Sequence, residues 1–166
     1  RHFSPLNYTH RLRWCLLLIF VTLSGWAQAE PVGTVMNVSG PLFAIKGDNS
    51  RKVLSVGSSV EQGDMLVTEE KTYARVKFTD SGEVTLRPNT QFKVNAYSFK
   101  QAEPKSDNVV LSLFKGALRS VTGAIGKRGN QDAYQLQTAT ATIGIRGTQF
   151  IAELVAGDAP AAVAAE

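Results

Sequence analysis

Alternation of apolar and polar residues is the feature that most restricts how this chain can fold. Residues 74–79 place Ala, Val and Phe at every second position, and residues 84–86 and 92–96 repeat the pattern. A period of two residues is typical of a β-strand with one buried face, whereas an amphipathic helix needs a period of about 3.6. Because no window of the chain sustains the helical spacing for long, the sequence predicts an all-β protein.

Turn-forming residues divide the alternating segments into short strands. Asp80-Ser81-Gly82 predicts a hairpin with a left-handed glycine, and Pro88-Asn89 ends the next strand because proline lacks the N–H of a central ladder. Gly116 is expected to bend a later strand, and the polar residues 100–108 are expected to form a surface loop. We expect a single compact domain of short, mostly antiparallel strands, either a sandwich or a β-roll, with a short β-solenoid as the alternative.

The first 29 residues have the organisation of a secretory signal. Arg11 and Arg13 precede the apolar run from Trp14 to Leu23, and Ala27-Gln28-Ala29 supplies the small residues of a cleavage site. Even when extended to Ala27, the apolar stretch has 14 residues, fewer than the ~20 that a membrane-spanning helix needs. The pattern predicts export to the periplasm or the medium, cleavage after Ala29, and no stable membrane span afterwards.

The expected cleavage site defines the expected domain organisation. Residues 1–29 would hold upstream sequence and the signal, and residues 30–155 the β domain. Residues 156–166 are rich in Ala and Pro and are expected to form a tail or linker, with a short helix as an alternative for the alanine-rich end.

Loss of the signal would change the chemistry open to the chain, because His2, His10 and Cys15 all lie within it. Without imidazole or thiolate, the chain lacks the usual activators of Ser and Cys nucleophiles and the usual ligands of zinc, copper and iron. Basic residues fall from 18 to 15 against 14 acids, so the formal charge falls from +4 to +1. The sequence predicts no cofactor, no metal and no nucleic-acid partner.

Carboxylates are the catalytic groups that remain. Each candidate lies beside Gly, Thr or another turn signal, a position typical of solvated turn residues. A glycosidase would need two of them at a defined separation. A carboxylate-based enzyme acting on cell-wall or exported polysaccharide is therefore the alternative function, with Asp64, Glu69, Glu70, Asp80 and Glu83 as its candidates.

Ordered sequence blocks run through the predicted β domain: Gly63 to Thr68, Ala74 to Gly82, Leu86 to Thr90, Lys115 to Arg119 and Thr138 to Phe150. In this order, the blocks resemble the FecR family, the periplasmic module of FecR regulators and of many exported proteins. The resemblance covers roughly residues 32–154 and implies a β-rich, non-enzymatic binding or interaction module of the bacterial cell envelope, with a role in signalling or surface assembly as the expected context. Its partner would be another envelope protein or a glycan.

The chain departs from membrane-anchored FecR regulators at its N-terminus. It shows no helical cytoplasmic segment before a full-length membrane span, so we do not expect the half of those regulators that acts on a sigma factor. The residues of the family motif are expected to have structural roles. They are Gly63, Asp64, Asp80, Gly82, Pro88, Asn89, Gly116, Thr138, Gly144, Arg146, Gly147, Thr148 and Phe150.

Arg146 is the most unusual residue of the last block, because it lies inside an apolar run. Strict alternation would place Arg146 and Phe150 opposite Ile143 and Ile145, and a bulge with positive φ at Gly147 would return Phe150 to the isoleucine face. Gly144 would leave room for the guanidinium. We expect Arg146 to be partly buried and to organise nearby carbonyls or one carboxylate. The alternatives are an anion site and simple surface exposure.

Two other segments admit a binding interpretation. Residues 123–131 contain several glycines with Lys127 and Arg128; they lack the spacing of a phosphate-binding loop, so a flexible solvated hairpin tip is expected. Aromatic residues could form a platform for sugars, although alternation places most of them in the core. They are Phe78, Phe92, Tyr97, Phe99 and Tyr134.

Overall fold

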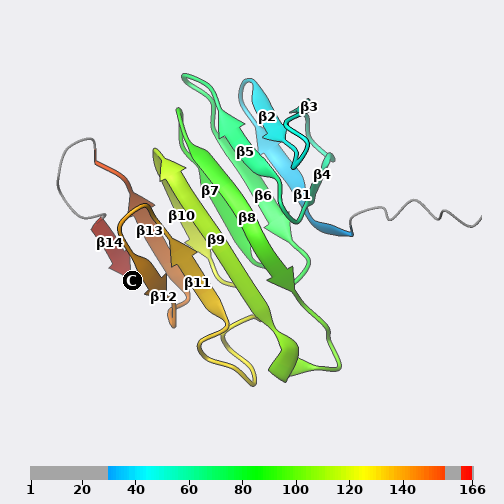
Figure 1. Cartoon of the computed structure of the whole chain (residues 1–166), viewed down its shortest axis with the longest axis vertical. Coiled ribbons are helices and arrows are strands. Elements are labelled where there is room, and N and C mark those ends of the chain that lie inside the picture. Colours follow the sequence, from blue (N-terminus) through cyan, green and yellow to red (C-terminus); the bar gives the residue numbers. More distant parts are fainter. Residues whose placement is uncertain (1–29, 156–161, 166) are drawn as a thin grey trace, which may run out of the picture.

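The computed structural model describes residues 30–155 and 162–165, and two seven-stranded sheets pack face to face in it (Figure 1). Paired strands in the described chain are antiparallel, apart from β9 and β11, which run parallel. The spatial order in sheet A is β14 (Ala162–Ala165), β13 (Gln149–Glu153), β10 (Ala117–Val121), β7 (Glu83–Leu86), β6 (Ala74–Phe78), β1 (Pro31–Val38) and β4 (Ser59–Glu61). The order in sheet B is β12 (Thr142–Gly144), β11 (Tyr134–Gln137), β9 (Asn108–Lys115), β8 (Gln91–Ser98), β5 (Met65–Thr68), β2 (Leu42–Ile45) and β3 (Arg51–Leu54).

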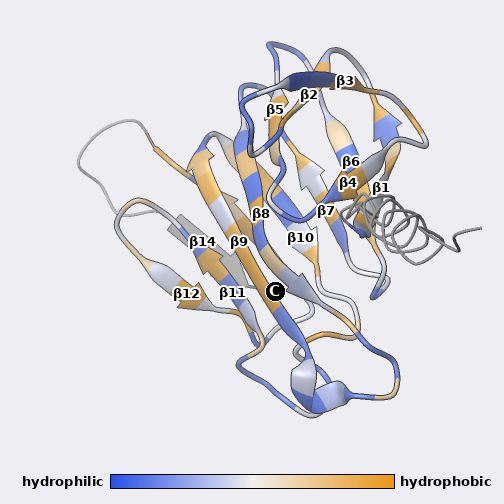
Figure 2. Ribbon diagram, turned by 45° about the vertical axis from the view of Figure 1, so that its right-hand side comes forward, coloured by the Kyte–Doolittle hydropathy of each residue, from blue (hydrophilic) through white to orange (hydrophobic). Residues whose placement is uncertain are grey.

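The alternating pattern of the sequence is also the pattern of burial. In β6, Ala74, Val76 and Phe78 are buried, whereas Arg75 and Lys77 are exposed. Hydrophobic and hydrophilic residues follow one another along many strands (Figure 2). The inward residues of both sheets form one core, in which each buried Leu, Val or Phe side chain contributes about 1.5–3 kcal/mol. The predicted all-β single domain is confirmed, with the sandwich as its architecture.

The chain passes repeatedly from one sheet to the other. One such passage leads from β9 to β10 through Gly116, which has a φ of 81°. A Cβ at this position would lie 2.5 Å from the Thr90 hydroxyl, so a side chain is excluded by space as well as by conformation. Gly116 therefore ends one strand and redirects the chain into the other sheet.

The predicted hairpin between β6 and β7 is present, but its left-handed residue is different. Ser81 has a φ of 69°, whereas Gly82 is not among the glycines with positive φ. Gly82 is required for space, because a Cβ there would lie 3.0 Å from a carboxylate oxygen of Asp80 and 3.0 Å from the backbone nitrogen of Gly123. The prediction located the turn correctly and assigned the left-handed conformation to the wrong residue.

The loop and tail regions add short elements. The polar loop expected over residues 100–108 contains the 3-10 turn η1 (Pro104–Ser106). In the tail, residues 162–165 form β14 and pair with β13, in place of the short helix considered above. The signal region lies outside the described residues. Among the residues described, no helix has the length and apolarity needed to cross a membrane.

Candidate functional site

Asp80 is the centre of a buried hydrogen-bond cluster at one end of the sandwich. Its carboxylate accepts hydrogen bonds from the backbone N–H of Gly82 at 3.0 Å, the backbone N–H of Ile125 at 3.2 Å, and the hydroxyl of Tyr97 at 3.0 Å. The residue is 5% exposed. Gly123 must lack a side chain here, since a Cβ would lie 2.3 Å from the Asp80 carbonyl oxygen. Asp80 thus joins the β6–β7 turn to the β10–β11 connection and to β8.

Tyr97 completes this cluster from sheet B. Its hydroxyl accepts hydrogen bonds from the Thr79 hydroxyl at 3.1 Å and from the Asp80 backbone N–H at 3.0 Å. Its ring stacks on Phe78 with 5.4 Å between the ring centroids. Burial is the largest influence on the Tyr97 hydroxyl and raises its pKa well above the usual range, so Tyr97 remains a neutral donor.

Asp64 forms a second internal site, on the turn between β4 and β5. Its carboxylate, 2% exposed, lies 2.9 Å from the ammonium of Lys46 and accepts the backbone N–H of Glu61 at 3.0 Å. Lys46 also lies 2.9 Å from the Glu61 carboxylate. Burial lowers the pKa of Lys46, but the bonds to Glu61 and Asp64 outweigh this and leave the pKa raised. Gly63 has a φ of 90°, which explains a glycine in this turn.

The motif residues Pro88 and Asn89 belong to a third structural site, together with Gly116. Asn89 has a φ of 55°, a conformation that asparagine tolerates better than most residues. The following Thr90 is fully buried, and its hydroxyl donates to the Ala117 carbonyl at 3.0 Å. This hydroxyl fills the space that the missing side chain of Gly116 leaves free.

The expected partial burial of Arg146 is wrong, and the alternative of surface exposure is correct, with one carboxylate as the partner. The Arg146 side chain is 67% exposed and pairs with the exposed Asp132 at 2.5 Å. Gly147 has no positive φ, and a Cβ on Gly144 would meet nothing within 4 Å. No bulge is needed, because β12 ends at Gly144 and the chain crosses to sheet A before β13 begins. Ile145 and Phe150 are both buried since they flank this crossing.

Thr122 stabilises the crossing between β12 and β13, a role that its sequence context did not reveal. Its buried hydroxyl donates to the carbonyl oxygens of Gly147 at 2.8 Å and Thr148 at 3.2 Å. Its backbone N–H donates to the Thr148 carbonyl at 2.8 Å. Thr138, at the other end of the block, accepts the Ala141 N–H at 3.1 Å and closes the turn before β12. The block is thus a structural connection between the sheets.

The glycine-containing loop of residues 123–131 is anchored to its surroundings. Arg128 forms a two-pronged ion pair with the buried Asp107, with both N–O distances at 3.1 Å. It also donates to the carbonyl oxygens of Lys100 and Gln101 at 2.8 Å each, and its guanidinium lies 4.5 Å from the centre of the Phe99 ring. Lys127 donates to the Thr122 carbonyl at 2.7 Å. Both cations of this loop have internal partners, which opposes a phosphate-binding role.

The candidate catalytic acids lie in separate local environments. Asp64 and Asp80 are bound internally as described; Glu69 pairs with Arg51 at 2.9 Å and Glu83 lies 3.9 Å from Arg75. Glu70 is exposed in the turn after β5. In the described part of the chain, no group of three or more His, Cys, Asp or Glu residues is arranged to hold a metal ion. The motif residues Asp64, Asp80, Asn89 and Gly116 therefore lie in several separate structural clusters.

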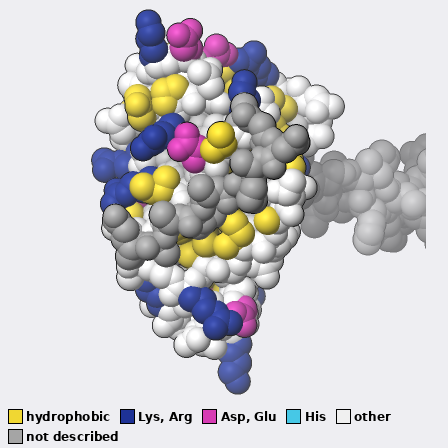
Figure 3. Space-filling view, turned by 90° about the vertical axis from the view of Figure 1, so that its left-hand side faces the viewer, with side chains coloured by type: hydrophobic (Ala, Val, Ile, Leu, Met, Phe, Trp, Pro, Cys, Tyr) yellow, Lys and Arg dark blue, Asp and Glu magenta, His cyan; other side chains and the backbone are white. Residues whose placement is uncertain are grey.

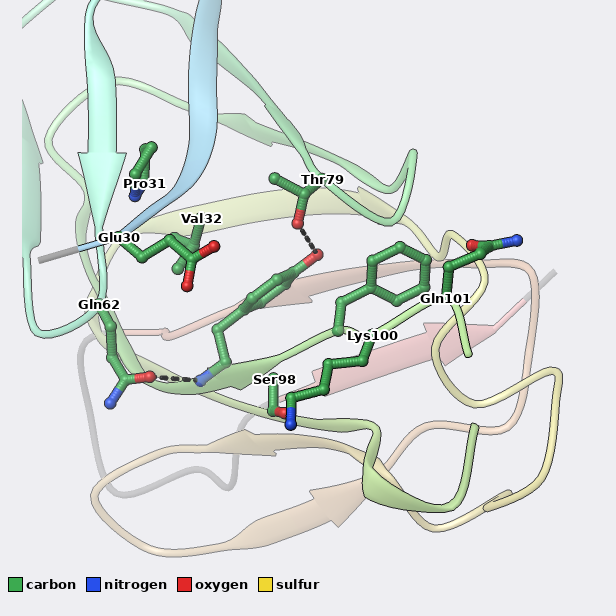
Figure 4. Close-up of a pocket in the computed structure, with 10 residues that line it drawn as sticks. Glu30, Pro31, Val32, Gln62, Thr79, Ser98, Lys100 and Gln101 are labelled. Atoms are coloured by element: carbon green, nitrogen blue, oxygen red, sulfur yellow. Dashed lines mark hydrogen bonds between the residues drawn. The ribbon is translucent and has the colours of Figure 1, made fainter. Parts of the chain in front are cut away.

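A cavity of about 650 Å³ opens beside Tyr97 (Figure 4). Glu30 and Gln62 lie on one side of it, and Ser98, Lys100 and Gln101 lie on the other. Its wall is formed by the start of β1, the β4–β5 turn, the β6–β7 turn and the end of β8. We call it the Tyr97 pocket. Tyr97 and Phe99, which both line the pocket, were among the aromatic residues considered from the sequence as a platform for sugars, whereas its polar residues were not expected to bind a ligand.

The outer face of sheet B carries apolar side chains on neighbouring strands. Phe43 lies directly opposite Val53 on one side and Val67 on the other, and Ile45 lies opposite Met65. Val53 is 68% exposed, and the other side chains of this group are half-buried. Cations flank the group: Lys93 is opposite Met65, and the Arg51 guanidinium lies 3.5 Å from the centre of the Phe43 ring. We call these apolar residues of β2, β3 and β5 the apolar face.

The family model described as FecR protein matches residues 64–165, well over half of the chain. The match includes Asp64, Asp80 and the segment from Thr138 to Phe150. No curated protein and no solved structure shows significant similarity to the chain. The chain belongs to the FecR family.

Proposed function

We propose that this protein is a non-enzymatic interaction module of the bacterial cell envelope, exported through its N-terminal signal. One observation carries the proposal: the buried carboxylates of Asp64, Asp80 and Asp107 are all engaged by the protein's own donors. A general acid or base must reach a substrate proton, and these three are occupied in holding turns together. Membership of the FecR family, which is associated with regulation and interaction, supports the same conclusion.

The apolar face is the surface through which a partner would bind. Contiguous apolar side chains on a sheet surface commonly mark contact with another protein. Lys93 beside Met65, and Lys115 beside Gln91 on the neighbouring strands, give the rim of this face a positive charge. The partner that fits is an envelope protein whose contact segment combines apolar side chains with carboxylates.

The face shown in Figure 3 lacks the arrangement of cations that a nucleic-acid site would have there. Lys and Arg side chains there are dispersed among other residues and do not form one continuous basic patch. A protein that binds nucleic acid through phosphates would concentrate such side chains on one face.

A matched pair of variants tests the proposal. Val53→Asp places a charge in the apolar face, whereas Val56→Asp places the same charge at a position that is similarly exposed, 62% against 68%, in the turn after β3. The parent protein and both variants would be immobilised and incubated with envelope extract, and captured proteins identified by mass spectrometry. We expect one envelope protein to be retained by the parent and by Val56→Asp, and lost with Val53→Asp. Equal retention by both variants would contradict binding through this face.

Export is tested separately, by mass spectrometry of the protein recovered from the periplasm or medium. We expect Glu30 as its first residue. A mature protein that retains residues 14–29 in the membrane would overturn this part of the proposal.

A further inference from the structure

We infer that the Tyr97 pocket binds a short, uncharged oligosaccharide. The site is separate from the apolar face, so the inference goes beyond the proposed function and does not depend on it. The cavity volume of about 650 Å³ falls within the range of roughly 300–1,000 Å³ that is usual for small-molecule sites. Its lining combines aromatic rings with amide and hydroxyl groups, the combination that suits the apolar ring faces and hydroxyl groups of sugars.

The aromatic part of the pocket is held rigidly. The Tyr97 ring is fixed by stacking on Phe78 and by the hydrogen bonds of its hydroxyl to Thr79 and Asp80. Phe99 is held through the Arg128 guanidinium, which lies 4.5 Å from the centre of its ring and is itself anchored to Asp107. Aromatic surfaces that are already ordered lose little conformational entropy when a ligand binds.

Several polar side chains of the pocket have hydrogen-bonding groups that are not used within the described part of the protein. The Gln62 side-chain oxygen accepts the Tyr97 backbone N–H at 3.0 Å, which orients the amide and leaves its NH₂ group without a partner among the described residues (Figure 4). In the same described region, the side chains of Ser98, Gln101 and Glu30 make no hydrogen bonds to other side chains or to the backbone. These groups offer donors and acceptors that can be shared with sugar hydroxyl groups.

The charges in the lining of the pocket do not favour phosphate-containing ligands or divalent cations. After the proposed cleavage, Glu30 contributes its carboxylate together with the α-ammonium group of the new N-terminus, and the ammonium of Lys100 already lies 3.3 Å from Glu103. A phosphate or nucleotide would need an excess of cations, which this lining lacks. A divalent cation would need several carboxylates. Among the described residues that line the pocket, Glu30 alone carries one. Because the lining has no excess of either charge, a neutral ligand with many hydroxyl groups fits the pocket best.

The experiment is an NMR titration of the ¹⁵N-labelled protein with three probes: chitotetraose, cellotetraose and tetragalacturonate. A peptide of alternating Glu and Leu is the fourth probe. We expect one of the two neutral sugars to shift the amide signals of Gln62, Ser98 and Lys100, with weaker or no effect from tetragalacturonate. Absence of shifts with both neutral sugars, or shifts at these positions with the peptide alone, would overturn the inference.

Variants link the shifts to the pocket. Gln62→Ala and Phe99→Leu should each weaken binding of the active sugar at least tenfold, because the first removes the free amide and the second removes the ring while keeping apolar volume. Gln135→Ala, on the outer face of sheet B, is the matched control and should bind like the parent. Unchanged affinity in both pocket variants would refute the assignment. If the sugar did not bind in this pocket but Val53→Asp still abolished capture of the envelope protein, the inference would be refuted and the proposed function would stand.

Discussion

Replacing Asp80 with alanine would remove the acceptor that connects three segments of the fold. The substitution leaves the backbone N–H groups of Gly82 and Ile125 without their partner, together with one bond from the Tyr97 hydroxyl. An orphaned buried donor costs ~1–3 kcal/mol, and bonds to a charged acceptor lie at the upper end. We therefore expect Asp80→Ala to lower the free energy of unfolding by about 3–6 kcal/mol, the sum for two backbone donors at ~1.5–3 kcal/mol each.

Asp80→Asn refines the same prediction. The asparagine oxygen can keep one donor, whereas its NH₂ group would face the other as a second donor. The loss should be smaller than for alanine, ~1–3 kcal/mol. Asp132→Ala is the control, because the 71% exposed Asp132 side chain pairs only with the exposed Arg146 among the ion pairs of the described residues, and such surface pairs contribute ~0–1 kcal/mol.

Urea unfolding followed by circular dichroism measures these differences, with a constant slope as the check that the unfolded states are comparable. The expected order of stability is parent and Asp132→Ala, then Asp80→Asn, then Asp80→Ala. If Asp80→Ala unfolded at the same urea concentration as Asp132→Ala, the buried cluster would not be stabilising the fold and the reasoning would be refuted.

Three further predictions use the same unfolding assay. Arg146→Ala should cost less than ~1 kcal/mol because its ion pair is exposed. Thr122→Val should cost more, ~1–2 kcal/mol, because the part-buried carbonyl of Gly147 loses its donor while the Thr148 carbonyl keeps the Thr122 backbone N–H. The reverse order would restore the organising role expected for Arg146. Gly123→Ala should be strongly destabilising, since its Cβ would lie 2.4 Å from the Gly82 nitrogen, and near-parental stability would contradict the packing. Because the pKa of Lys46 is raised in the folded protein, its charge stabilises the fold fully below the ordinary pKa of 10.5, and this contribution is lost as the pH rises through the higher folded pKa. The difference in unfolding free energy between the parent and Lys46→Met should therefore shrink above about pH 10.5. A constant difference would exclude the charge as its cause.

Local patterns in the sequence were sufficient to predict the strands and most turns. The alternation in residues 74–79, the hairpin after it and the break at Gly116 all depend on neighbouring residues, and all three are present. Pairing across the sheets depends on distant residues. Nothing near Thr122 or Arg128 indicates that one stabilises a crossing at Gly147 and that the other reaches Asp107.

The error at Arg146 has a specific physical cause. The expectation treats residues 141–150 as one alternating strand, and a single strand needs a bulge to bury Phe150. The chain leaves sheet B after Gly144 and enters sheet A at Gln149, so the two ends of the block follow separate alternations. A short apolar segment with two glycines gave no sign, by itself, of a change of sheet.

Site-specific photocrosslinking in living cells tests the central claim most directly. A photoreactive phenylalanine derivative would replace Val53 on the apolar face or, as the control, Val56 in the neighbouring turn. The account predicts a covalent adduct with one envelope protein from position 53, found in the envelope fraction, and no such adduct from position 56. Identical adducts from both positions, or none from position 53 in exported protein, would contradict an interaction module that binds its partner through this face.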